Sequence, residues 1–153
     1  MADYRIFLLV VTLPLPKILT IFVRIKYLSD LPDITYREFF LWLLGLRRRY
    51  RVSGNSMLPQ LKPGEDVLID RQAYKDKIPQ PQDLVVAFHP NKTELKIIKR
   101  IATVSRDRGV FLLGDNPLES TDSRDFGAVT LDALYGKVTS RFGFQRISEN
   151  AKY

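Results

Sequence analysis

Short apolar runs separated by turn residues fill the chain from residue 50 onward, and this pattern constrains the fold most. The runs contain many β-branched and aromatic residues, and a Lys62-Pro63-Gly64 turn precedes the first of them. Such closely spaced runs are typical of short β-strands. They lie at residues 66–70, 83–88, 95–104, 109–114 and 133–142. A further strand-like stretch begins at Tyr50. The sequence therefore predicts a mainly β body.

The composition excludes several kinds of catalytic site. With 153 residues the chain forms one domain, with room for an N-terminal appendage, and needs no metal or disulfide for its core. It contains no cysteine, which excludes a thiol nucleophile and cysteine-ligated zinc. The only histidine, His89, lies in a turn-like context, so a Ser-His-Asp triad is not favoured. We expect neither a metal nor a cofactor.

Positive charge is concentrated in the N-terminal third. Residues 1–51 hold nine basic and four acidic side chains, whereas residues 52–153 hold fifteen basic and thirteen acidic ones. Basic residues interleaved with apolar runs suit an anionic membrane surface. A nucleic-acid-binding protein would carry its basic face on the folded body. We therefore expect a membrane surface as a partner, and no nucleic acid.

Two apolar segments precede the β body. Residues 6–23 are apolar apart from Lys17 but contain Pro14 and Pro16, so they either span a membrane or lie on it. No small-residue cleavage site follows, so a removable signal peptide is not expected. Residues 39–44 precede an arginine run and include Trp42. They form either an interfacial anchor or an amphipathic helix packed on the domain. We divide the chain into a membrane-associating segment, 1–49, and a folded β domain, 50–153.

A serine and a distant lysine indicate the chemistry. Ser56 lies in Gly54-Asn55-Ser56-Met57-Leu58-Pro59, where glycine permits a tight turn. Lys99 lies in an alternating run, so it shares one strand face with Ile97 and Ile101. Desolvation on that face favours the neutral amine, which can accept a proton from a serine hydroxyl. The pair indicates a serine hydrolase that needs no histidine.

A dense polar segment follows at residues 114–127. It contains Gly114-Asp115-Asn116 and then Ser120, Asp122, Ser123, Arg124 and Gly127. A solvated loop does not require so many small polar groups beside an aspartate and an arginine. We interpret the segment as a buried hydrogen-bond network in which Asp122 and Arg124 are charge partners.

Taken together, these three motifs closely resemble the signal peptidase I family of Ser–Lys endopeptidases. The resemblance covers roughly residues 50–142 and implies a mostly β, signal-peptidase-like body with one or two N-terminal apolar helices. It implies that Ser56 is the nucleophile and Lys99 the general base, with Ser120 holding the lysine amine. Asp122 and Arg124 would support this arrangement.

Two departures from the family pattern concern the residues around these motifs. Many members carry a serine two residues before the nucleophile that completes the oxyanion hole, and here that residue is Gly54. The Ser56 amide would supply one half of the hole, and the hydroxyl of Ser53 is a candidate for the other. The lysine motif also lacks the family's following Gly-Asp pair.

A narrower resemblance is to the maturation proteases of nickel-type superoxide dismutase, which remove an N-terminal leader. It rests on residues 42–52 and on the polar segment at 114–124. The implied partner is a precursor protein with a leader peptide. Alternatives are a general signal peptidase I that processes exported proteins, a self-cleaving regulator, and a non-catalytic binding module on the same fold.

The arginines between the last apolar run and Ser56 bear on orientation. Arginine clusters prefer the cytoplasmic side of a membrane, so Arg47, Arg48, Arg49 and Arg51 favour a catalytic body on that side. Packing of these arginines on the domain would remove this indication. The alternative is a soluble cytoplasmic protein.

Overall fold

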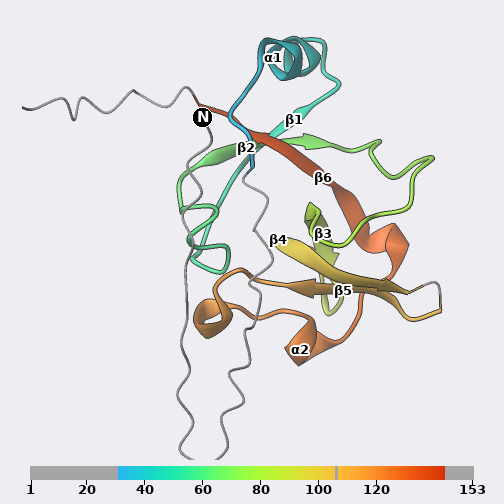
Figure 1. Ribbon diagram of the computed structural model, residues 1–153. Helices are drawn as coiled ribbons and strands as arrows, with labels where there is room; N and C mark the ends of the chain where they lie inside the picture. Colours follow the sequence, from blue (N-terminus) through green and yellow to red (C-terminus); the bar gives the residue numbers. More distant parts are fainter. Residues whose placement is uncertain (1–30, 106, 144–153) are drawn as a thin grey trace, which may run out of the picture.

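A computed structural model describes residues 31–143 except Arg106. Helices are few and short, and most of the regular structure is strand (Figure 1). In chain order the elements are α1 (Tyr36–Leu43), β1 (Arg48–Arg51), β2 (Asp66–Asp70), β3 (Leu84–His89), β4 (Lys92–Ser105), β5 (Gly109–Leu113), η1 (Pro117–Glu119), α2 (Ser123–Phe126), η2 (Leu131–Ala133) and β6 (Leu134–Arg141). The prediction of a mainly β body is confirmed.

The strands form one six-stranded antiparallel sheet in the order β1-β2-β6-β3-β4-β5. Strand β6, the last in sequence, joins β2 to β3 in the middle of the sheet. The β1–β2 connection and the segment from β5 to α2 lie on the same side of the molecule (Figure 1). These two connections carry the serine motif and the polar segment predicted from the sequence.

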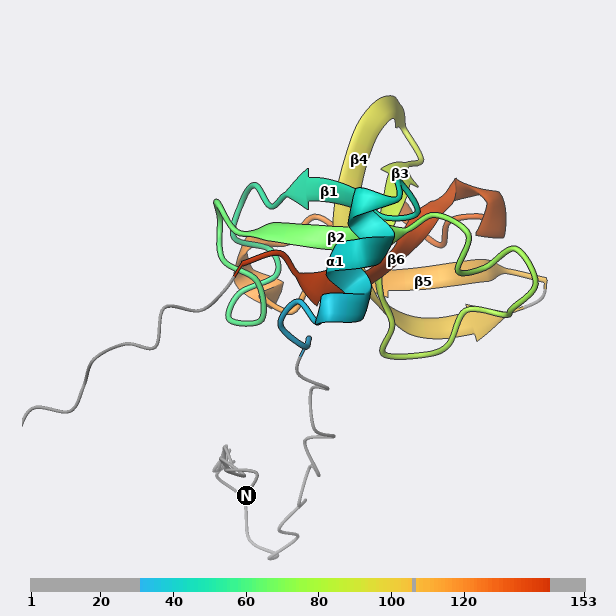
Figure 2. The same cartoon turned by 90° about the horizontal axis from the view of Figure 1, so that it is seen from above.

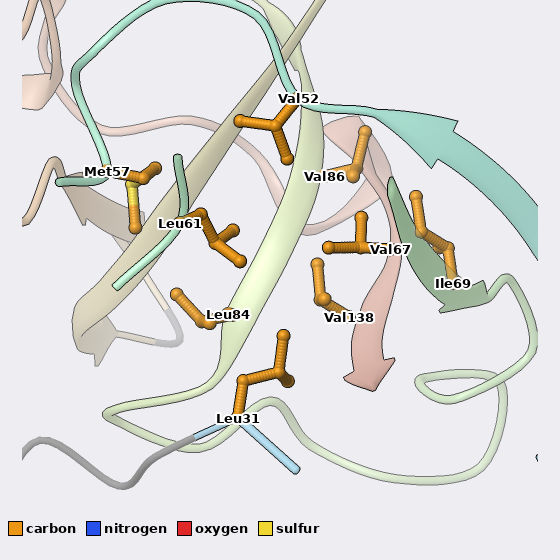
Figure 3. Close-up of a cluster of buried hydrophobic side chains, with 9 residues drawn as sticks. All are labelled: Leu31, Val52, Met57, Leu61, Val67, Ile69, Leu84, Val86 and Val138. Atoms are coloured by element: carbon orange, nitrogen blue, oxygen red, sulfur yellow. The ribbon is translucent and has the colours of Figure 1, made fainter. Parts of the chain in front are cut away.

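Strand β3 separates two hydrophobic clusters. Its side chains alternate between sheet faces, so Leu84 and Val86 enter one cluster while Val85 and Ala87 enter the other. The first cluster is shown in Figure 3 and contains Leu31, Val52, Met57, Leu61, Val67, Ile69, Leu84, Val86 and Val138. The second contains Val85, Ala87, Ile101, Val110, Leu112 and Val129. A strand buried on both faces explains the continuous apolar run at 84–87.

Helix α1 packs on the sheet body at the end far from α2 (Figure 1), and in the view from above it lies over the sheet (Figure 2). The Thr35 hydroxyl caps its first turn by accepting from the Glu38 amide at 3.2 Å. The Trp42 ring lies 4.8 Å from that of Phe142, centroid to centroid. The amphipathic helix packed on the domain is therefore the form observed. Its outer face leaves Phe40 and Leu43 exposed.

The arginines after α1 are engaged with the body. Arg47 pairs with both Glu38 (2.8 Å) and Asp70 (3.1 Å). Arg49 and Arg51 both pair with Asp66, so three of the four arginines are held by carboxylates of the domain. The cluster therefore no longer indicates which side of a membrane the body occupies.

The first apolar segment, residues 6–23, lies outside the described residues. Within residues 31–143, no helix has the length and apolar character that a membrane crossing requires. The domain boundary at residues 49/50 stays a prediction, although Leu31 already belongs to the hydrophobic core and β1 begins at Arg48.

Candidate active site

Ser56 lies in the turn that connects β1 to β2. The turn is anchored by Met57 and Leu61, whose side chains enter the first hydrophobic cluster beside Leu84 (Figure 3). The Leu61 amide donates to the Met57 carbonyl at 2.8 Å, which closes the turn immediately after the serine. Core packing thus fixes the backbone next to Ser56, while Ser56 itself is half-buried.

Gly54 adopts a left-handed backbone with φ of 77°. A side chain at this position would meet open space, because no atom lies within 4 Å of a Cβ built there. The constraint is therefore on the backbone alone. A serine at this position would be disfavoured by its backbone conformation and not by a steric clash.

Gly54→Ser is accordingly expected to destabilise the protein rather than restore an oxyanion-hole hydroxyl. Forcing a residue with a side chain into this conformation costs about 1 kcal/mol. We expect that loss in the free energy of unfolding measured by urea titration, without a gain in cleavage rate. A more active Gly54→Ser protein of parental stability would contradict this account.

Lys99 lies in β4 directly opposite Val85 of β3. Its neighbours on the same face, Ile97 and Ile101, pack in the second hydrophobic cluster, and only 3% of Lys99 is exposed. Burial lowers the pKa of the amine, and the opposing attraction of the Asp122 carboxylate does not cancel this effect. The Nζ atom donates to the Ser120 hydroxyl at 3.0 Å.

Asp122 is the acceptor at the centre of the polar segment. Its fully buried carboxylate accepts from the Ser120 hydroxyl (2.7 Å), the Gly114 amide (2.9 Å) and the Arg124 guanidinium (2.7 and 2.8 Å). Burial raises the pKa of Asp122, but the bonds from Arg124, Gly114 and Ser120 outweigh it and hold that pKa well below its usual range. Asp122 thus stays ionised and fixes the Ser120 hydroxyl, whose oxygen accepts the hydrogen bond from Lys99.

The serine turn and the polar segment are joined directly. The Asn116 amide donates to the Ser56 carbonyl at 3.0 Å, and the Asn116 side chain donates to the Asn55 carbonyl at 3.2 Å. Gly114 permits this approach, since a Cβ there would lie 2.6 Å from both the Ser56 carbonyl oxygen and the Ser120 Cβ. Ser56 and Ser120 therefore flank the same glycine.

The structure thus gathers Ser56, Lys99, Ser120, Asp122 and Arg124 into one region. Within residues 31–143, no hydrogen bond joins the Ser56 hydroxyl to Lys99, whose partner is Ser120. The Ser56 amide also donates no hydrogen bond in this part of the chain.

Two other residues considered in the sequence lie apart from this network. Ser53 is exposed, and its hydroxyl forms no hydrogen bond among the described residues. His89 ends β3, where its Nδ1 accepts from the Asn91 amide at 3.1 Å and its ring packs against Phe126. Within the described ranges, no cluster of three or more histidine, cysteine or acidic side chains could hold a metal ion.

The sequence interpretation missed one buried ion pair. Arg100 donates two hydrogen bonds to Asp115, at 2.7 and 2.8 Å, and a third to the Gln82 carbonyl at 3.0 Å. In the sequence, Arg100 directly follows Lys99 and Asp115 directly follows Gly114. Alternation along β4 places Arg100 on the face opposite Lys99. Its partner lies in another segment, and spacing alone does not reveal it.

The amino-acid sequence matches the family described as signal peptidase, peptidase S26, over residues 38–108 and 104–143. These matches cover well over half of the chain. The chain belongs to the S26 signal peptidase family. All five of the gathered residues fall within the matched region of the S26 peptidases.

Similar S26 proteins come from mitochondria and from bacteria. Mitochondrial inner membrane protease subunit 2 of Mus musculus is 32% identical over 110 residues, which cover 58% of this chain and 63% of the relative. The corresponding Danio rerio protein is 30% identical, with 58% and 60% covered. Signal peptidase I of Bacillus caldolyticus is 26% identical over 143 residues, with 61% and 78% covered. The chain therefore spans less than two thirds of the mitochondrial relatives it matches.

Proposed function

We propose that this protein is a serine endopeptidase that removes an N-terminal leader with Ser56 as nucleophile and Lys99 as general base. The observation that carries the proposal is the Lys99–Ser120–Asp122 chain beside the Ser56 turn. A buried amine with a lowered pKa is a base that can act near neutral pH. The geometry and the S26 family membership support the same chemistry.

The reaction would proceed through an acyl-enzyme. The Ser56 oxygen attacks the scissile carbonyl while its proton passes to the Lys99 amine. The Ser56 amide, which donates to no other described group, is available to the developing oxyanion. The leaving amine takes the proton from Lys99, and a water deprotonated by Lys99 then hydrolyses the ester. Asp122 and Arg124 act through the position of Ser120, and Ser53 remains a candidate second oxyanion donor.

The pH dependence of cleavage tests the base. Because only the neutral amine accepts the serine proton, kcat/KM is expected to rise with pH as Lys99 loses its proton. The midpoint should lie below the ordinary lysine pKa, since burial lowers it. A His89→Ala variant should give the same profile when initial rates are measured across the pH range. A rising limb that disappears with His89 would contradict Lys99 as the base.

The substrate that we propose is the precursor of a nickel-type superoxide dismutase. Support comes from the sequence resemblance at residues 42–52 and 114–124. The test is co-expression of the full chain with that precursor, and separately with an exported precursor, followed by mass measurement of each product's N-terminus. The dismutase precursor should be shortened by its leader, and Ser56→Ala should leave it intact.

The other outcomes of this test identify the alternatives. Processing of the exported precursor alone would assign a general signal peptidase. Self-cleavage of the chain, with neither precursor cut, would assign a regulatory protein on the same fold. Intact precursors together with an intact chain would assign a non-catalytic module.

The location that we propose is a membrane, with the catalytic body on the cytoplasmic side. Support comes from membrane relatives and from Arg24 and Lys26, which follow the first apolar segment. In right-side-out membrane vesicles the body is expected to resist added protease until detergent is present. Digestion of the body while a cytoplasmic marker survives would place it outside. Recovery of the chain in the soluble fraction would assign a soluble protein.

A further inference from the structure

Both ends of the Ser56 turn are held by donors from elsewhere in the fold. At the start, the Asn116 amide binds the Ser56 carbonyl at 3.0 Å. At the end, the Arg141 guanidinium binds the Gln60 carbonyl at 2.6 Å. A charged donor on a buried carbonyl is a strong restraint, and Gln60 is buried. Arg141 thus fixes the backbone four residues after the nucleophile.

Arg141 binds the segment that enters the body from the N-terminal third at the same time. Its guanidinium donates to the Leu31 carbonyl at 2.7 Å, and its own amide donates to the Pro32 carbonyl at 2.9 Å. With its side-chain oxygen facing the available donors, Gln60 accepts from the Leu31 amide at 2.8 Å. Leu31 is therefore held by Arg141 on one side and by the serine turn on the other.

Side-chain packing reinforces this junction. Leu31 is buried in the same cluster as Met57 and Leu61, the two residues that anchor the serine turn (Figure 3). Arg141 ends β6 and pairs with Val67 of β2. The junction of Leu31, Gln60 and Arg141 is therefore attached to two neighbouring strands inside the sheet. The only acidic partner of Arg141 within residues 31–143 is Glu65, at a long 3.8 Å. The short contacts of the guanidinium are thus with backbone carbonyls.

We propose that Arg141 is a positioning residue for Ser56, and that it makes Leu31, the attachment point of the N-terminal segment, part of the nucleophile's support. This inference rests on the proposed function. Without the guanidinium, the buried Leu31 and Gln60 carbonyls lose their donor and the turn shifts. A displacement of about 1 Å can lower a catalytic rate roughly 100-fold while substrate binding persists.

The test compares Arg141→Gln, Arg141→Lys and a matched control, Arg51→Gln, in the full chain. Arg51 also lies at a strand end of the sheet but is exposed and bound to Asp66. We expect Arg141→Gln to lower kcat roughly 10- to 100-fold with KM within about twofold. Arg141→Lys should recover part of kcat, because an ammonium group keeps the charge but lacks the guanidinium fork. Arg51→Gln should match the parent.

A second measurement on the same proteins does not depend on catalysis. In Arg141→Gln, amide hydrogen exchange should accelerate at Leu61 and Asn116, which bond to Met57 and Ser56. Exchange at Ile101 and Val110, whose amides donate to the Asp83 and Val129 carbonyls, should not change.

The outcomes separate this inference from the proposed function. The parent chain could cleave no precursor while Arg141→Gln still loses protection selectively at Leu61 and Asn116. That result would support the role of Arg141 in holding the turn and would refute the proposed peptidase activity. Parental kcat in Arg141→Gln would overturn the inference. An equal acceleration of amide exchange at all four positions in Arg141→Gln would also overturn it, because Arg141 would then contribute only to global stability.

Discussion

Ser56→Ala and Lys99→Met are each expected to abolish precursor cleavage, with a loss of at least about 1000-fold in kcat/KM. Without the hydroxyl no acyl-enzyme forms, and without the amine no base accepts its proton. Lys99 is buried against Ile97 and Ile101, so methionine fills the same space without a charge. The measurement is the initial rate of leader removal, followed by mass spectrometry.

Stability is the control for this prediction. Because burial lowers the pKa of Lys99, the folded protein binds that proton less tightly than the unfolded chain does. The charged lysine therefore disfavours folding increasingly as pH falls below its ordinary pKa. Lys99→Met should unfold at no lower a urea concentration than the parent at pH 7. Substantial cleavage by either variant would refute the Ser–Lys pair.

Asp115→Ala is expected to cause the largest loss of stability, about 3–5 kcal/mol in the free energy of unfolding. Both side chains of the Arg100–Asp115 pair are buried, with 7% and 6% exposed. Removal of the carboxylate leaves the guanidinium in the interior, where the Gln82 carbonyl is its one remaining acceptor among the described residues. Urea titration at pH 7 measures the change.

Arg124→Ala gives a comparison for that loss. The Arg124 side chain is 45% exposed. When Arg124 is replaced, Asp122 still accepts hydrogen bonds from Ser120 and Gly114. We therefore expect a smaller loss than in Asp115→Ala. An Asp115→Ala protein that is as stable as the parent would show that the buried pair contributes nothing net to folding.

Strand positions could be predicted well where apolar runs were bounded by turns. Strand β2 covers residues 66–70 as predicted. Strand β3 is shifted by one residue at each end, and β5 ends one residue earlier than predicted. Strand β4 begins at Lys92, earlier than predicted, because pairing with β3 extends it through polar residues. The local sequence shows the alternation typical of a strand, but it does not show the neighbouring strand whose pairing sets the strand's length.

In the candidate site, the strand position of Lys99 and the pairing within the polar segment were predictable, whereas other contacts were not. Alternation placed Lys99 between Ile97 and Ile101, and the structure has it there opposite Val85. The polar segment suggested that Asp122 and Arg124 are partners, and they form a bidentate ion pair. Arg100–Asp115 and the Arg141 junction could not be found in this way, because their partners are brought together only by sheet topology.

Active-site labelling tests the central claim most directly. The full chain is treated with a fluorophosphonate, which phosphonylates an activated serine with loss of fluoride, and the modified residue is mapped by mass spectrometry after digestion. We expect a single label on Ser56 that forms faster as pH rises and does not form in Lys99→Met. A label on another residue, or labelling of Ser56 at the parental rate in Lys99→Met, would contradict the central claim.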